Sequence, residues 1–160
     1  MRYTYMDSPV GELMLAGDRE ALRWIGFAGG RMARRAAPGW VRDPAAFAAV
    51  REQLDAYFAS QLTRFDLPLA PQTTPFQGRV LAALREVPYG ATISYGELAR
   101  RVGNPRAARA VGMANARNPI PVIIPCHRVI GASGELTGFG GGLDIKRTLL
   151  ALEQGASRAA

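Results

Sequence analysis

The chain has 160 residues, of which 48% are hydrophobic and 21% charged, so it can form a packed core and is not globally disordered. One cysteine excludes an intramolecular disulfide, and one cysteine with one histidine excludes a four-ligand Cys/His zinc site. The net charge of +7 suits a polyanionic partner if the basic residues are clustered. The longest apolar run, 120–125, is far shorter than the roughly 20 residues that span a membrane.

The first residues predict a cytoplasmic protein with an α+β beginning. Asp7 stands where a secretory signal needs an apolar stretch. Short apolar runs separated by turn residues predict strands over 2–6, 12–16 and 21–27. An Arg-rich loop over 31–43 follows.

A helix over 44–60 and a short strand complete the amino-terminal half. Asp43 offers an N-cap and Pro44 a first helical position, and apolar residues follow at helical spacing. Residues 65–69 are predicted as another strand, in which a proline suits a sheet edge. Nothing in 1–72 suggests chemistry, so we expect a small α+β scaffold domain there.

Three prolines within 67–75 predict a linker, and we expect the second domain to cover 73–160. The first helix of this domain has Thr74 as its N-cap. It ends at Val87, ahead of a Pro-Tyr-Gly turn.

Two further helices have the arrangement of a helix-turn-helix. The first covers 94–102 with Ser94 as its N-cap, and the second covers 104–117 with Asn104 as its N-cap. The short turn between them contains Gly103. Ordinary helical hairpins share this pattern, so it does not identify a DNA-binding motif by itself.

Basic residues are concentrated in this second half. Residues 71–160 hold 11 Arg and Lys against 5 Asp and Glu, whereas residues 1–70 hold 9 against 8. Six arginines and no acidic residue lie between positions 100 and 128. GC-rich codon usage would explain arginine in place of lysine but not this one-sided placement, so the charge favours a nucleic-acid partner.

The segment 120–130 is apolar and β-branched, which predicts a buried, extended stretch. A Gly-rich loop over 131–142 follows, and it lacks the pattern of a phosphate-binding P-loop. Apolar residues at helical spacing predict a final helix over 143–154.

The only cysteine and the only histidine are neighbours within the apolar segment, at Cys126 and His127. A lone cysteine is usually an inert core residue, but a neighbouring imidazole favours a nucleophilic thiol because it lowers the thiol pKa. Adjacent side chains of an extended segment point to opposite faces, so proton transfer between the two needs a kinked backbone or a bridging water. Glu153 in the final helix is the candidate to orient the imidazole. What the thiol attacks is still open at this point.

The motifs of the second half resemble one protein family. The segment IPCHRVI (124–130) carries the PCHR signature of the O6-alkylguanine-DNA alkyltransferases. The resemblance extends through ISYGELAR (93–100), GNPRAARAVG (103–112), NP (118–119), GGL (141–143) and LLALE (149–153). It implies a mixed α/β (α+β) protein, in which a small ribonuclease H-like domain precedes a mainly helical domain with a winged helix-turn-helix-like motif.

The resemblance also implies a role for each residue of the site. Cys126 would take the alkyl group from O6 of guanine, His127 would deprotonate the thiol through a water, and Glu153 would hold His127. Asn118 would brace the active-site segment, and Tyr95 would donate a hydrogen bond to the base as negative charge develops. The transfer would need no cofactor or metal and would consume one protein molecule for each alkyl group. O4-methylthymine would react more slowly.

The implied partner is double-stranded DNA, bound by a monomer in the minor groove with the damaged base flipped out of the stack. Arg109 would fill the gap in the duplex, and the backbone of Val129 would contact the edge of the base. The other predicted DNA contacts are Asn104, Gln77, Ala107, Ala108 and Gly140. Small residues around Arg109 suit a narrow groove, although they would equally allow close helix packing.

Two positions depart from the family pattern, and two other functions stay open. Gly140 stands where many relatives have serine and Phe139 where tyrosine is common, which affects the fit of bulky alkyl groups rather than methyl transfer. A DNA-binding regulator without chemistry is one alternative, but it would have no use for Cys126 beside His127. A cysteine hydrolase is the other, and the arginine stretch without acidic residues argues against it.

Overall fold

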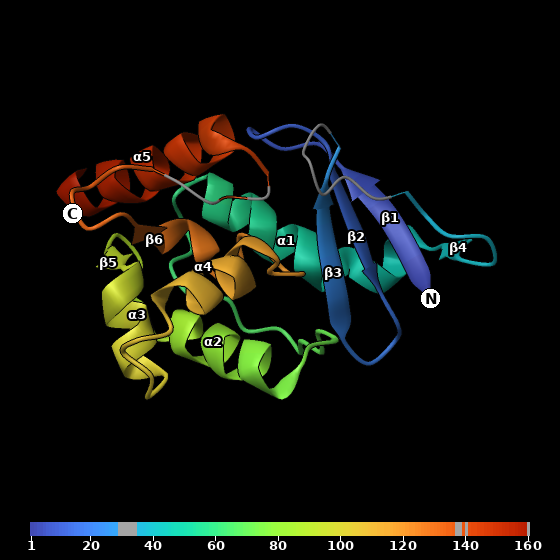
Figure 1. Cartoon of the computed structure of the whole chain (residues 1–160). Coiled ribbons are helices and arrows are strands. Elements are labelled where there is room, and N and C mark those ends of the chain that lie inside the picture. Colours follow the sequence, from blue (N-terminus) through green and yellow to red (C-terminus); the bar gives the residue numbers. More distant parts are fainter. Residues whose placement is uncertain (29–34, 137–138, 140, 160) are drawn as a thin grey trace.

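The computed structural model describes residues 1–28, 35–136, 139 and 141–159. A sheet with one long helix forms the amino-terminal part, and four helices with a small two-stranded sheet form the rest (Figure 1). This is the mixed α/β class that the sequence predicts. Within the described residues, no helix is long and apolar enough to cross a membrane.

The amino-terminal sheet has the strand order β3-β2-β1-β4. Its strands are β1 (Arg2–Met6), β2 (Leu13–Gly17), β3 (Leu22–Phe27) and β4 (Val41–Arg42). The strands β1, β2 and β3 pair in an antiparallel manner, with Leu15 between Thr4 and Ile25, and β4 adds to β1 in parallel. The three longer strands lie within one residue of the predicted bounds.

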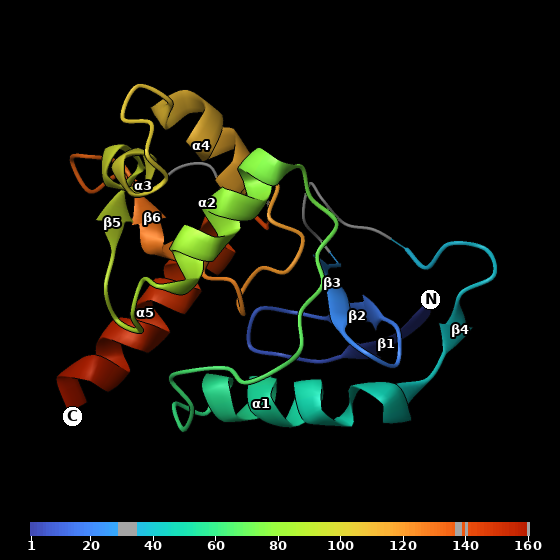
Figure 2. The same cartoon turned by 90° about the horizontal axis from the view of Figure 1, so that it is seen from below.

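The predicted helix over 44–60 is divided into two parts. A 3₁₀ turn, η1 (Pro44–Phe47), leads into α1 (Ala48–Phe58), which lies along one face of the sheet (Figure 2). Asp43 makes no capping hydrogen bond, because its carboxylate is paired with Arg2 of β1. Asp43 thus occupies the predicted N-cap position ahead of Pro44, but its side chain does not cap the helix and its carboxylate ties the start of the helix to the sheet instead.

The predicted strand over 65–69 is also wrong. This segment contributes only an isolated bridge between Leu69 and Leu22. The N–H of Leu22 donates to Pro68 O at 2.9 Å, and the N–H of Ala70 donates to Leu22 O at 2.8 Å. Prolines at 68 and 71 lack the N–H groups that a continuous ladder needs, so the pairing stops there.

The carboxyl-terminal part contains α2 (Pro75–Arg85), α3 (Tyr95–Arg101), α4 (Ala108–Ala116) and α5 (Leu143–Ala159). The short strands β5 (Ile93–Ser94) and β6 (Val129–Ile130) pair in parallel. The predicted caps of α2 and α3 are confirmed: Thr74 Oγ1 accepts from the N–H of Gln77, and Ser94 Oγ accepts from the N–H of Glu97, each at 3.1 Å. Helix α5 begins at the predicted residue and extends beyond 154.

The helix predicted over 104–117 begins later, at Ala108. Asn104 is not its N-cap; its carbonyl accepts from the N–H of Ala107 at 3.0 Å in a tight turn. Residues 103–106 are exposed, and the first fully buried side chain of α4 is Val111. Because short helices depend on tertiary packing, the unpacked residues before Ala108 stay outside the helix.

The two parts of the chain share one hydrophobic core. The N–H of Ile25 in β3 donates to Pro119 O at 2.9 Å. Phe27, at the end of β3, lies against Gly141, where a Cβ atom would approach the ring to 2.7 Å. Glycine is therefore needed at 141 for this contact, which fixes the start of α5 against the sheet. The domain boundary between 72 and 73 stays a prediction.

Candidate active site

The segment that leads to the cysteine is folded back on itself by Asn118, which is buried. Its Oδ1 accepts from the N–H of Ile120 at 3.0 Å, and its Nδ2 donates to Ile124 O at 2.7 Å. Val122, between these contacts, has a φ of 73°, a left-handed value that β-branched residues rarely adopt. The prediction of an extended stretch over 120–130 is therefore wrong: only Val129–Ile130 form a strand.

Cys126 and His127 lie in a 3₁₀ turn, η2 (Cys126–Arg128). Such a turn has three residues per turn, so successive side chains point in different directions. Cys126 lines a cleft, whereas His127 is fully buried and points toward α5. The backbone is therefore kinked at Cys126 and His127 and not extended.

Cys126 is 3% exposed. Burial raises its pKa to about 11, and this effect outweighs the hydrogen bond from Asn118 and the positive charge of Lys146, which both lower it. The carbonyl of Cys126 accepts from Asn115 Nδ2 at 3.2 Å, which fixes the backbone of the turn. At neutral pH the resting group is therefore a thiol in a fixed position, not a thiolate.

Glu153 of α5 lies at the centre of a buried hydrogen-bond network. His127 Nε2 lies 2.5 Å from Glu153 Oε2, and Arg128 Nε lies 2.7 Å from Oε1. Tyr57 Oη and the N–H of Gly90 also donate to the carboxylate. Burial alone would raise the pKa of Glu153, but the hydrogen bonds from His127 and Arg128 outweigh it and lower the pKa to about 2.

His127 is neutral and has one free nitrogen. Burial lowers the pKa of the imidazole, and the hydrogen bond and charge of Glu153 offset this only in part. An ionised carboxylate only accepts hydrogen bonds, so Nε2 carries the proton. His127 Nδ1 is buried and has no hydrogen-bond partner among the residues that the structure describes. Its lone pair is therefore available to accept a proton.

Lys146, the only lysine in the chain, is a site residue that the sequence analysis missed. It is fully buried on α5, and its Nζ donates to Val129 O at 2.6 Å. The same Nζ lies 6.0 Å from the centroid of the Tyr95 ring. A signal was available, because Lys146, Leu149 and Glu153 follow one another at the spacing of one helix face.

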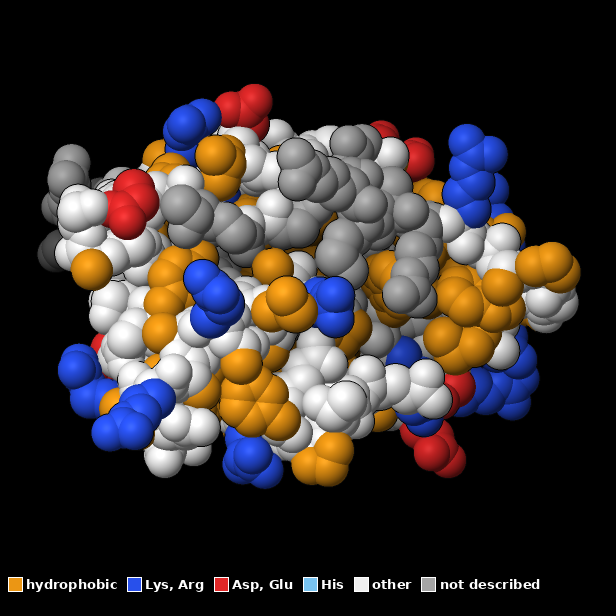
Figure 3. Space-filling view, viewed as in Figure 1, with side chains coloured by type: hydrophobic (Ala, Val, Ile, Leu, Met, Phe, Trp, Pro, Cys, Tyr) orange, Lys and Arg blue, Asp and Glu red, His pale blue; other side chains and the backbone are white. Residues whose placement is uncertain are grey.

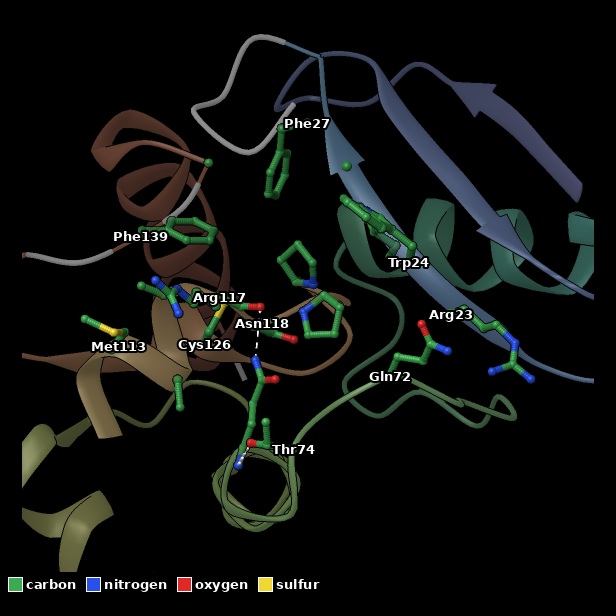
Figure 4. A pocket seen from close by; sticks show the side chains of 18 of the residues that line it. Arg23, Trp24, Phe27, Gln72, Thr74, Met113, Arg117, Asn118, Cys126 and Phe139 are labelled. Carbon is green, nitrogen blue, oxygen red and sulfur yellow. Dashed lines mark hydrogen bonds between the residues drawn. The ribbon is translucent and has the colours of Figure 1, made fainter. Parts of the chain in front are cut away.

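A cleft of about 1160 Å³ lies between β3, α2 and α4, with Cys126 in its wall. In Figure 4, Trp24 and Phe27 face Met113 and Cys126 across this cleft. Most of the side chains that line it are apolar, and Asn118, Gln77 and Arg117 are among the polar exceptions. A group bound in this cleft would lie next to Cys126.

The structure brings some of the predicted DNA contacts to this cleft and leaves others apart. Gln77 lines it and donates from Nε2 to Arg117 O at 3.2 Å. Arg109 is exposed at the start of α4 and makes no hydrogen bond or ion pair with the described part of the chain; Asn104 is exposed in the preceding turn. Ala107 and Ala108 are half-buried, Val129 is fully buried, and Gly140 lies outside the described residues.

Helix packing does not require the small residues at two positions of α4. A Cβ atom at Gly112 would make only an ordinary contact, at 3.5 Å, with the half-buried ring of Tyr95. Ala110 is exposed and lines the cleft, so helix packing does not explain its size. Basic side chains stand out around the face that carries α2, α3 and α4 (Figure 3). This face therefore combines a slim helix with positive charge.

The described residues include no group of three or more His, Cys, Asp and Glu side chains that could hold a metal ion.

The chain is similar to known proteins over its whole length. Residues 75–155 match the family model for the 6-O-methylguanine DNA methyltransferase DNA binding domain, and residues 1–71 match the model for the ribonuclease-like domain of the same family. A methylated-DNA–protein-cysteine methyltransferase of Methanosarcina acetivorans is 52% identical over 96% of this chain and 98% of its own length. The protein of that name from Mycolicibacterium paratuberculosis is 52% identical over 99% of this chain and 96% of its own. Among solved structures, Mycobacterium tuberculosis OGT in complex with DNA is 50% identical, with a TM-score of 0.91 over 98% of this chain and 94% of that one.

Proposed function

This chain belongs to the 6-O-methylguanine DNA methyltransferase family, and we propose that it repairs DNA by transferring an alkyl group from O6 of guanine to its own Cys126. The observation that carries this proposal is the position of Cys126, which lines an open cleft while the next residue, His127, contacts Glu153. A nucleophile, a base and a group that orients the base are thus in one place.

The transfer is a displacement at the alkyl carbon. The bond from Cys126 Sγ to carbon forms as the bond from carbon to O6 breaks, and the electron pair of the broken bond passes to guanine. The proton of the thiol moves to His127 Nδ1, through a water between the two side chains. With a pKa of about 11, only about 0.01% of the thiol is ionised at pH 7, so the proton has to leave as the alkyl group approaches.

The other residues support this step. Glu153 holds the imidazole through Nε2 and leaves Nδ1 free to accept the proton, and Asn118 keeps the turn that presents Cys126. Tyr95 donates a hydrogen bond to the base as guanine takes up negative charge. The product is a thioether, which offers water no leaving group, so each molecule acts once. The reaction balances without a cofactor. We expect O4-methylthymine to be a second, slower substrate.

DNA binding uses the arginine-rich face of α3 and α4. Atom O6 is inaccessible to in-line attack inside the stack, so the nucleotide has to rotate out of the duplex and into the cleft. Arg109, exposed and unpaired with the described residues, fills the gap, while Ala107 and Ala108 let the helix enter the minor groove. Asn104 and Gln77 contact the DNA backbone, and the backbone of Val129 contacts the edge of the base. A free thiol and a DNA substrate both suit the cytoplasm, where we place the protein.

Intact-protein mass spectrometry after mixing with a duplex that carries one O6-methylguanine tests the proposal. We expect the protein to gain one methyl group in place of a proton, on the peptide that holds Cys126, and the reaction to stop at one equivalent. The variant Cys126→Ser should bind the same duplex without any gain in mass. Lesion-selective binding with an unchanged wild-type mass would make the protein a recognition factor. Turnover of a thioester or amide substrate would make it a hydrolase.

A further inference from the structure

The amino-terminal part of the chain reaches directly into the site through Tyr57 of α1. The hydroxyl of Tyr57 donates to Glu153 Oε2 at 2.5 Å, and both residues are almost completely buried. The same oxygen, Oε2, lies 2.5 Å from His127 Nε2. One carboxylate oxygen is therefore shared between the imidazole of the site and a hydroxyl from the part of the chain predicted to be only a scaffold.

The ring of Tyr57 is held in place from several sides. Its centroid lies 5.3 Å from that of Phe58, 5.3 Å from that of Phe65 and 6.1 Å from that of Tyr89. Burial and the negative charge of Glu153 raise the pKa of Tyr57 far above its ordinary value. Its hydroxyl therefore stays protonated and acts as a fixed donor to Glu153.

We propose that Tyr57 is a positioning residue, which holds Glu153 for His127 and thereby sets how readily the imidazole takes the proton of Cys126. This inference rests on the proposed transfer to Cys126. A hydrogen bond from Tyr57 draws negative charge on Glu153 toward the hydroxyl and away from His127. Without it, the carboxylate interacts more strongly with a protonated imidazole, so His127 becomes more basic.

Other groups around His127 keep their charges when the hydroxyl is removed. Glu153 and Lys146 face it from α5, and Arg128 and Cys126 lie on its own turn. Tyr89 approaches the network from the segment after α2, where Arg128 lies 5.8 Å from its ring centroid. A change in the titration of His127 on removal of the Tyr57 hydroxyl therefore reports on that hydroxyl.

The test compares Tyr57→Phe with the matched control Tyr89→Phe. Tyr89 is a neighbouring tyrosine whose buried hydroxyl makes no hydrogen bond to Glu153 or His127. His127 is the only histidine, so its ring signals in NMR are unambiguous. For each protein we would titrate these signals from pH 4.5 to 8 and measure the rate of methyl transfer from duplex O6-methylguanine over the same range.

We expect the midpoint of His127 and the acid limb of the rate profile to move upward together by about half a pH unit or more in Tyr57→Phe, and to stay at the wild-type values in Tyr89→Phe. Unchanged midpoints in Tyr57→Phe, even with lower stability, would overturn the inference. If Tyr57→Phe does not fold, the wild-type ring carbons of Tyr57 must titrate with the midpoint of His127, and no response there would also overturn it. A wild-type protein that takes up no methyl group would instead contradict the proposed function.

Discussion

The buried thiol makes a quantitative prediction about the reactivity of the resting protein. The pKa of Cys126 is raised from an ordinary 9.0 to about 11. At pH 8 the thiolate fraction is then about 0.1%, compared with about 10% for an ordinary cysteine. Only the thiolate is nucleophilic, so the rate of reaction follows this fraction. Ionisation alone should therefore slow the reaction of the folded protein with iodoacetamide by about 100-fold, and the 3% exposure of Cys126 should slow it further.

The assay follows the mass of the intact protein during reaction with iodoacetamide between pH 6 and 10. Cys126 is the only cysteine, so every thiol adduct reports on this site. The rate should rise about tenfold with each pH unit over the whole range, since the pH stays below the pKa. The same chain unfolded in urea provides the control, and its rate should level off near pH 9 to 10.

A rate that is high and flat between pH 6 and 9 would refute this reasoning. Such a profile would mean that Cys126 is already a thiolate paired with a protonated His127, which is the resting state of many cysteine hydrolases. The measurement therefore also separates the proposed transferase from its main chemical rival, without DNA in the assay.

Three other residues lead to predictions. The pKa of Glu153 is lowered from 4.5 to about 2. The stability that the charged carboxylate provides is therefore fully present above pH 4.5 and is lost as the pH falls from 4.5 toward 2. Urea unfolding should show about 2 kcal/mol less stability at pH 3 than at pH 6 from this group, and an unchanged value would mean that the buried carboxylate is not charged. Asn118→Ala leaves buried backbone groups of Ile120 and Ile124 unpaired, and should lower the free energy of unfolding in urea by about 2–4 kcal/mol. Arg109→Ala should slow methyl transfer from duplex DNA at least about tenfold but leave the reaction with free O6-benzylguanine within about twofold. An equal loss on both substrates would refute the flipping role.

The sequence correctly predicted the strands and helix caps that depend on residues close by in the chain. The three long strands and the caps Thr74 and Ser94 were predicted because turn residues and capping hydroxyls act within a few residues. Asp43 and Asn104 have the same chemistry, but Asp43 stands at its N-cap position without a capping hydrogen bond, and Asn104 lies ahead of the helix that it was predicted to cap. The carboxylate of Asp43 has a distant competitor in Arg2, and the residues after Asn104 lack packing partners.

In the site, too, only the residues with a local sequence signal were predicted. Cys126 and His127 were found because they are adjacent, and Glu153 through its place in the last helix. The apolar composition of 120–130 predicted an extended stretch, whereas Asn118 and the prolines fold the chain into turns there. Tyr57 looks like an ordinary core residue of an amphipathic helix, and its bond to Glu153 joins residues 96 positions apart. No periodicity within α1 could indicate such a contact.

The η2 turn resolves an apparent conflict between a thiol that is hard to ionise and a site built to use it. On its cleft side, Cys126 lies among apolar walls, which keep it neutral and unreactive toward small electrophiles. On its inner side, His127 is held by Glu153, which Arg128 keeps charged and which also accepts a hydrogen bond from Tyr57. The resting site does not stabilise a thiolate. The proton can therefore leave the thiol only when an electrophile in the cleft is already aligned with Sγ. That arrangement suits a protein whose nucleophile can react only once, because every reaction with a wrong electrophile would consume a molecule.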